Sequence, residues 1–199
     1  MKNRFVCIGF IVLILISISA CSAVELEENT FPLAVLVGEE NEKVMYGLSF
    51  QVAPGKGNTF AESKTEYESH LNKNTDYNHL KVLVMEEEVL KKQYIYIDML
   101  DYLAQTEIYP RNTYVCVVDD VDDMLEFEKR LSQDIGTYLE EYLKSHESKK
   151  AKLLTLGDLL NEKENQTMIQ YLPYLEVEEN YVKWTGYVNT LGKIWKESQ

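Results

Sequence analysis

The feature that most constrains the fold is an alternation of strand-like and helix-like segments over residues 43–118. It ends in Thr113–Val118, a nearly unbroken β-branched run of the kind found in strands covered on both faces. Before it, an apolar segment over 78–85 predicts a strand, and the segment 94–104, stopped by Pro110, predicts a helix. This order of strands and helices predicts right-handed crossovers and a mostly parallel centre.

A hairpin is predicted at each end of this alternation. The first joins strands over 31–37 and 43–52 through a five-residue loop. The second joins strands over 174–178 and 181–188 through the two residues between them. The hairpins therefore extend the predicted sheet on both sides.

Capping and spacing signals predict the helices. Thr59 is placed as an N-cap with Glu62 at capping-box spacing, and acids open the helix that starts at Glu86. Further helices are predicted over 119–131, 134–146 and 155–160. The predicted fold class is α/β (α+β mixed). It has a central mixed β-sheet of about six strands, a βαβαβ core and helices packed on its faces, all in one domain over 31–199.

The N-terminus has the layout of a secretory signal. Lys2 and Arg4 precede an apolar stretch that ends in Ile18-Ser19-Ala20-Cys21. The cysteine at this junction predicts a bacterial lipoprotein signal peptide over 1–20 (a lipobox). Its thiol would be acylated, for example with palmitate, so the membrane is a predicted partner through Cys21.

Two alternatives to the lipoprotein signal stay open. The run of 16 residues from Phe5 to Ala20 is about 24 Å long as a helix, against about 30 Å for a hydrocarbon core, so a plain transmembrane anchor fits less well. The other alternative is an ordinary signal cleaved near Ala23. In the lipoprotein interpretation, residues 21–30 form an acidic tether between membrane and domain.

Charge excludes some partners. The chain carries a formal charge of −13, and removing residues 1–20 takes away two cations and no acid, which gives −15. Nucleic acid is not expected as a partner at that charge, and an anionic bilayer would repel the domain. A lipid anchor would then supply the membrane affinity.

No residue pattern predicts catalysis, a metal or a cofactor. The three histidines (His70, His79 and His146) have no cysteine near them at zinc-ligand spacing. The acidic run Asp119–Asp123 lacks the later residues of a calcium loop and is better explained by helix capping. Cys116 lies inside an apolar strand, where a thiol is inert. We therefore expect a protein that is not an enzyme.

Aromatic residues are the one excess in the composition. The chain has 14 tyrosines and two tryptophans, more than a core of this size needs. Ordinary core and rim packing is one explanation. The other is a protein-contact surface near the C-terminus, because such rings are enriched at interfaces. We call its candidates the C-terminal aromatic set: Tyr171, Tyr174, Tyr181, Trp184, Tyr187 and Trp195.

Six segments, in order, resemble a known family. They are Cys21, Phe31-Pro-Leu-Ala-Val35, Gly55-Lys-Gly57 leading into Thr59-Phe-Ala-Glu62, His79–Met85, Arg111–Val115, and Leu172–Val177 with Tyr181–Gly186 after it. Together they resemble the N-terminal domain of the Ger(x)C family, the lipoprotein C subunits of spore germinant receptors. No single segment is specific, but their order spans nearly the whole chain after residue 20.

The resemblance implies a location and partners. Family members sit on the outer face of the inner spore membrane, held by diacylglycerol on the cysteine. They assemble with integral membrane A-type and B-type receptor subunits, take part in nutrient-triggered germination, and are not known as enzymes. An alternative is a standalone extracytoplasmic lipoprotein of the same domain type, acting as scaffold or sensor outside germination.

The resemblance covers the N-terminal domain only. Family members usually continue into two further domains, whereas this sequence stops at Gln199, soon after Trp184-Thr185-Gly186. A natural single-domain form and a truncation of a three-domain protein are both compatible with this.

Overall fold

The structure is a computed structural model that describes residues 29–48, 53–147, 153–165 and 170–196. The predicted signal peptide, Cys21 and the tether up to residue 28 lie outside these described residues. The last two residues of the predicted tether form a short strand, β1 (Asn29–Thr30). Within the described residues no helix has the length and apolar character needed to cross a bilayer.

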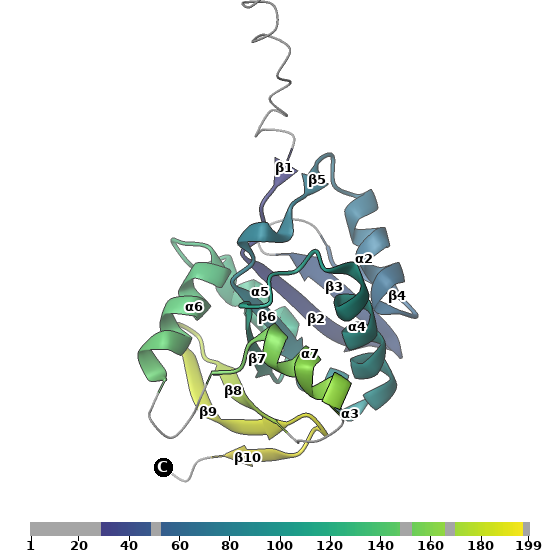
Figure 1. The fold of residues 1–199 in the computed structure, drawn as a ribbon. Coiled ribbons are helices and arrows are strands. Elements are labelled where there is room, and N and C mark those ends of the chain that lie inside the picture. The colour runs from purple at the N-terminus through teal and green to yellow at the C-terminus, as the bar shows by residue number, and fades with distance from the viewer. Residues whose placement is uncertain (1–28, 49–52, 148–152, 166–169, 197–199) are drawn as a thin grey trace, which may run out of the picture.

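An eight-stranded mixed sheet forms the middle of the domain, in the order β10-β9-β8-β7-β6-β2-β3-β4 (Figure 1). The four central strands, β2, β6, β7 and β8, are parallel to one another, and the strands outside them pair antiparallel. Their bounds are β2 Ala34–Glu40, β3 Lys43–Leu48, β4 Gly55–Gly57, β6 Val82–Glu86, β7 Tyr114–Val118, β8 Tyr171–Val177, β9 Val182–Asn189 and β10 Ile194–Lys196. The α/β class, the parallel centre and the hairpins at both ends are confirmed.

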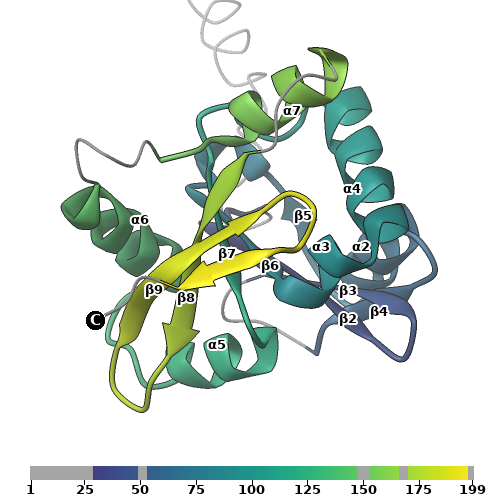
Figure 2. The same cartoon turned by 90° about the horizontal axis from the view of Figure 1, so that it is seen from below.

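Helices cover both faces of the sheet, as Figure 2 shows. One face is covered by α2 (Phe60–Ser69), α3 (Glu87–Lys91), α4 (Gln93–Thr106) and α7 (Leu156–Asn165). The other face is covered by α5 (Val121–Glu128) and α6 (Ile135–His146). A short 3-10 helix, η2 (Tyr77–His79), precedes β6.

The apolar run of β7 explains this layering. Val115 and Val117 belong to the core under α4, whereas Cys116 and Val118 belong to the core under α5 and α6. Because side chains alternate along a strand, only an unbroken apolar run can fill both cores at once. The structure confirms the prediction made from this run.

The starts of α2 and α6 were predicted well because each has a side-chain cap, whereas α3 and α4 begin without a side-chain cap bond. The Thr59 side chain accepts a hydrogen bond of 3.2 Å from the backbone N–H of Glu62. The Asp134 side chain caps α6 in the same way through the N–H of Gly136, at 2.7 Å. These oxygens satisfy N–H groups that have no partner inside the helix.

The connection in the first hairpin was predicted incorrectly, and the connection in the second was predicted correctly. The first loop has two residues rather than five, because Glu39 and Glu40 continue the strand ladder and Asn41 and Glu42 turn the chain with positive φ angles of 52° and 67°. The predicted loop was too long because the strand runs on into polar residues. In the second hairpin the backbone N–H of Glu178 donates to the carbonyl of Tyr181 at 2.9 Å, in register with the pair Val177 and Val182, so the predicted two-residue connection is confirmed.

The predicted sheet of about six strands also lacked its two edges. The segment Gly55–Gly57, expected to break the pattern, is the edge strand β4, and β10 was not predicted at all. Both have only three residues, which is too short for an alternating side-chain pattern to be recognised in the sequence.

Candidate functional site

The chain enters the domain beside the segment that precedes β6. Strand β1 pairs in parallel with β5 (Asn74–Thr75) as a separate two-stranded sheet. The backbone N–H of Asp76 donates to the carbonyl of Thr30 at 2.9 Å, and that of Lys81 donates to the carbonyl of Leu33 at 2.9 Å. The point where the predicted tether joins the domain is therefore fixed.

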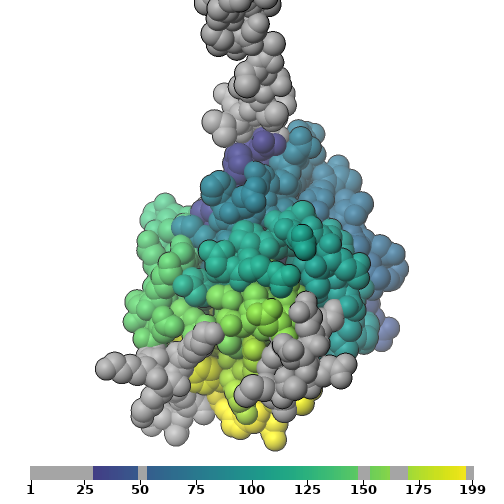
Figure 3. All heavy atoms as spheres, in the orientation of Figure 1, coloured from purple at the N-terminus to yellow at the C-terminus, as the bar shows by residue number. Residues whose placement is uncertain are grey.

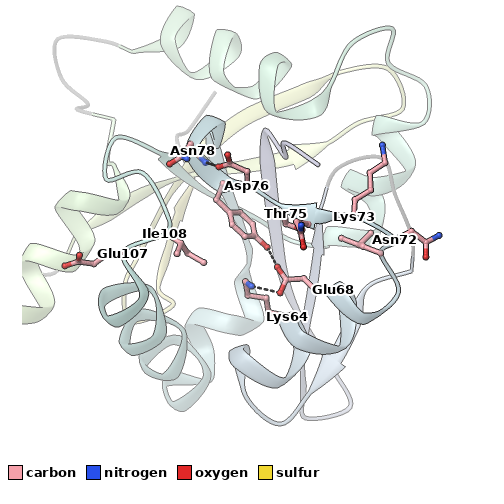
Figure 4. Close-up of a pocket in the computed structure, with 12 residues that line it drawn as sticks. Lys64, Glu68, Asn72, Lys73, Thr75, Asp76, Asn78, Glu107 and Ile108 are labelled. Atoms are coloured by element: carbon pink, nitrogen blue, oxygen red, sulfur yellow. Dashed lines mark hydrogen bonds and ion pairs between the residues drawn. The ribbon is translucent and has the colours of Figure 1, made fainter. Parts of the chain in front are cut away.

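A polar cleft of about 1080 Å³ lies next to this entry point. It is bounded by the C-terminal half of α2, by β5 and η2, and by the residues that follow α4 (Figure 4). The lining residues are Lys64, Glu68, Leu71, Asn72, Lys73, Asn74, Thr75, Asp76, Tyr77, Asn78, Glu107 and Ile108.

Three lining residues of the cleft, Lys64, Glu68 and Tyr77, bind one another. The buried Lys64 ammonium lies 2.6 Å from Glu68 Oε2 and 5.3 Å from the ring centre of Tyr77. Glu68 Oε1 accepts a hydrogen bond of 2.8 Å from Tyr77, whose hydroxyl accepts one of 2.8 Å from Tyr46. Burial raises the pKa of Tyr46 and Tyr77 well above the usual value, so both phenols stay neutral. The network stabilises the fold and offers no nucleophile.

A second group of polar residues lies at the carboxyl ends of the parallel strands. The chain leaves β6 for α3 and α4 on one face and leaves β7 for α5 on the other face. In open α/β sheets such a switch point is where ligands bind. In this protein the carboxyl ends carry acids, notably Glu39, Glu86 and Asp120.

Glu86 is the most perturbed acid at this edge. Its Oε2 accepts a hydrogen bond of 2.7 Å from the backbone N–H of Glu39, whose own carboxylate pairs with Lys92 at 2.7 Å. Burial raises the pKa of Glu86 to about 7. The negative charge of Asp120 adds to this increase, and the hydrogen bond from Glu39 opposes it. A Cβ on Gly38 would lie 2.6 Å from Glu86 Oε2, so glycine leaves the room that this carboxyl occupies.

The sequence interpretation missed this role of Glu86, because it treated the acid only as the start of a helix. A usable signal was its position directly after a buried apolar strand. Among the residues that the structure describes, no group of three or more His, Cys, Asp or Glu side chains is arranged to hold a metal ion. Cys116 is fully buried, and burial alone raises its pKa to about 12.

The structure distributes the C-terminal aromatic set over different environments. Tyr174 is only 3% exposed, and its hydroxyl donates to Glu87 Oε2 at 3.1 Å, so it lies in the core and not on a contact surface. Trp184 and Tyr187 are half-buried, with ring centres 5.5 Å apart. Trp184 Nε1 donates to the carbonyl of Gly186 at 2.7 Å.

The other members of the set are exposed. Tyr171, Tyr181 and Trp195 are 50%, 53% and 40% exposed, and the rings of Tyr171 and Trp195 lie 5.2 Å apart. Sequence reasoning missed Leu191, in the turn before β10, which is 59% exposed. Whether these residues contact a partner stays a prediction.

Strand β10 and the chain entry lie at opposite ends of the domain. Figure 1 shows β1 at the top and β10 at the bottom, and Figure 2, seen from below, has β9 and β10 in front. The space-filling view in Figure 3 shows the same separation between the purple N-terminal residues and the yellow C-terminal ones. A protein held by its N-terminal segment therefore leaves the β10 end free for contacts.

Comparison with known proteins gives one match. Residues 22–177 match the family model described as the spore germination protein N-terminal domain. The matched span begins one residue after Cys21 and includes all four parallel strands of the sheet. No curated protein and no solved structure matches the chain.

Proposed function

The chain belongs to the family of spore germination proteins that carry this N-terminal domain, and from this membership we propose that it is a membrane-anchored, non-catalytic subunit of a germinant receptor. The single observation that carries the proposal is the family match over 22–177. In this role the protein takes part in nutrient-triggered germination together with integral membrane subunits of the A and B types.

Anchoring through Cys21 is the first part of the proposal. The lipobox Ile18-Ser19-Ala20-Cys21 supports it, as does the start of the family match at residue 22. The net charge of −15 after residue 20 opposes attachment to an anionic bilayer by charge. Acyl chains contribute about 0.8 kcal/mol per buried CH₂, and two or more chains anchor stably. We place the anchor on the extracytoplasmic face, at the inner spore membrane.

A binding role without catalysis is the second part. Lys64, Glu68 and Tyr77 of the cleft are bound to one another, and the Cys116 thiol is buried. An anchor confines the domain to the membrane plane, which raises its effective concentration toward integral partners. The exposed aromatic residues at the end away from β1 supply a surface for such contacts.

The anchor is tested by metabolic labelling with palmitate. We expect Cys21→Ala to abolish incorporation and to release the protein from the membrane fraction. Cys116→Ala is the matched control, because it also removes a cysteine but leaves the lipobox intact, and it should incorporate label normally. Equal labelling of Cys21→Ala and the parent chain would refute the assignment.

The role in germination is tested by deleting the gene and following nutrient-triggered germination of the spores. We expect slower or absent germination with at least one nutrient, restored by the parent gene but not by Cys21→Ala. Normal germination in the absence of a related gene, together with normal palmitate labelling, would support the standalone lipoprotein instead.

A further inference from the structure

The C-terminal hairpin differs in charge from the rest of the chain. Residues 180–196 contain Lys183, Lys193 and Lys196 and no acid, whereas the whole chain has a formal charge of −13. The same 17-residue stretch carries four aromatic side chains, Tyr181, Trp184, Tyr187 and Trp195. It is therefore a cationic and aromatic segment on an acidic domain.

The turn between β9 and β10 is built to hold its shape. Gly192 has a φ of +74°, and its N–H donates to the carbonyl of Asn189 at 2.8 Å. Asn189 Oδ1 accepts from the backbone N–H groups of Leu191 at 3.1 Å and Lys193 at 2.8 Å. Gln93 Nε2, from α4, donates to the carbonyl of Thr190 at 2.9 Å, so the turn is attached to the domain.

Strand β10 is the last strand of the sheet, and no described strand pairs with its outer side. The Asn189 N–H donates to the carbonyl of Lys193 at 3.0 Å, and Ile194 and Trp195 lie opposite Val188 and Tyr187. Because bonded and non-bonded pairs alternate in an antiparallel ladder, the backbone N–H and C=O of Ile194 point to the outer side. These groups are free to pair with another strand.

Side chains beside this edge form an aromatic face. Leu172, Val188 and Ile194 pack toward the core under α4, so alternation places Tyr171, Tyr187 and Trp195 on the opposite face. Tyr171 contacts Trp195, and the Lys193 ammonium lies 5.5 Å from the ring centre of Trp195. Apolar and anionic side chains of an added strand would both find complementary groups here.

We propose that the outer edge of β10 binds an extended acidic segment of a partner protein, which joins the sheet as an additional strand. Its backbone pairs with Ile194, and on the face that carries both Lys193 and Trp195 it places an apolar side chain against Trp195 and a carboxylate toward Lys193. Main-chain pairing supplies affinity and the side chains supply selectivity. This inference rests on the proposed protein-binding function and names the class of partner.

Two other occupants fit less well. A second copy would present the same acid-free segment, so Lys193 of each copy would approach a segment of like charge, which is destabilising. A bilayer is disfavoured because β10 lies at the end of the domain away from β1 (Figure 1). Charge complementarity therefore favours an acidic protein segment.

The test is a fluorescence titration of the purified protein in detergent, which reports on Trp184 and Trp195, the two tryptophans of the chain. The probe is a capped synthetic peptide, Thr-Glu-Thr-Val-Thr-Glu-Thr, whose valine and glutamates share one face of an extended strand and can reach Trp195 and Lys193 together. We expect saturable binding that weakens as salt is added, because exposed charge pairs are screened. A peptide with lysine in place of glutamate, and an N-methylated peptide of unchanged charge, should each bind at least tenfold more weakly.

Matched variants locate the site. Lys193→Glu should weaken binding about fivefold to tenfold, because it replaces an attraction with a repulsion. Lys56→Glu alters an exposed lysine on β4, the opposite edge of the sheet, and should leave the affinity unchanged. Equal effects of the two substitutions would overturn the proposal.

Other outcomes would also overturn it. Undiminished binding of the N-methylated peptide would exclude strand pairing. If the protein forms dimers and Lys193→Glu abolishes them, the edge binds a second copy. If the unanchored Cys21→Ala protein floats with anionic vesicles, and the added change Lys193→Glu prevents this, the edge binds a bilayer. The titration uses purified protein, so a negative result there leaves the labelling and germination tests of the proposed function unaffected.

Discussion

Tyr46 and Tyr77, which lie 31 positions apart in the chain, share a buried hydrogen bond of 2.8 Å between their hydroxyl groups. Tyr46 belongs to β3 and Tyr77 to η2, so the bond joins the first hairpin to the turn before β6. Through Glu68 the same network reaches the polar cleft beside the chain entry. The packing of the first hairpin and the shape of the cleft are thereby linked.

Replacing Tyr77 with Phe tests this link. The change leaves the Tyr46 hydroxyl and one oxygen of Glu68 without their partner, which costs about 1–3 kcal/mol when the groups are buried. Urea unfolding measures the loss. Tyr94→Phe is the control, because Tyr94 is exposed and its hydroxyl removal should change stability by less than about 0.5 kcal/mol. Equal effects of the two changes would mean that the network contributes nothing.

Glu86 predicts how stability depends on pH. Its pKa is raised from 4.5 to about 7 in the folded protein, so between these values the folded state binds more protons than the unfolded state. The contribution of Glu86 is thus fully present below about pH 4.5 and is lost as the pH rises through 7. At about 1.4 kcal/mol per pKa unit, and after reduction for the partial exposure of the group, we expect a loss of about 1–2 kcal/mol.

The variant Glu86→Gln should remove this part of the pH dependence. Its stability should equal that of the parent near pH 5 and exceed it by about 1 kcal/mol at pH 8, because no charge has to be buried. Denaturant unfolding across this pH range measures the difference. Glu126→Gln, on the exposed side of α5, should leave the slope of the parent unchanged. A parent slope retained in Glu86→Gln would contradict the prediction.

Two glycines offer a matched test of close packing. A Cβ on Gly136 would lie 2.3 Å from the carbonyl oxygen of Leu33, where neither α6 nor the chain entering β2 has room to move. Gly136→Ala should therefore destabilise the protein by about 1–3 kcal/mol. In Gly47→Ala the nearest atom is Pro54 Cβ at 3.8 Å, so stability should stay within about 0.5 kcal/mol of the parent. Thermal or urea unfolding of both variants gives the comparison.

Cys116 provides a chemical test of the core. Its thiol is fully buried and has a pKa of about 12, so the thiolate that reacts with disulfide reagents is almost absent at neutral pH. The test uses a chain without residues 1–20 in which Cys21 is blocked. A disulfide reagent should label Cys116 at the rate of unfolding in native buffer, and immediately in concentrated urea. Rapid labelling in native buffer would show that β7 is accessible.

The parts of the fold that were predictable carry local signals. The run Thr113–Val118 had to be buried on both faces, and Thr59 and Asp134 mark helix starts by their own side chains. The edges β4 and β10 were missed because each has only three residues, too few to show a strand period in the sequence. Local sequence therefore defined the centre of the sheet and not its margins.

The candidate site was less predictable, because it depends on neighbours that are distant in sequence. Tyr174 was expected at the surface, but β8 is covered on both faces, so Tyr174 lies in the core under α4 and Leu175 in the core under α5 and α6. Glu86 owes its raised pKa to burial beside β2 and α5. Neither effect is visible in a local pattern.

The position of β2 has a mechanical consequence for a protein anchored at Cys21, as proposed. The chain passes from β1, held by β5, directly into β2, which lies between β3 and β6 in the sheet. A pulling force on the anchor would act along β2 and load its hydrogen bonds to both neighbours together, in shear. The domain is therefore built to resist tension from the N-terminal side, because the bonds cannot be peeled apart one after another.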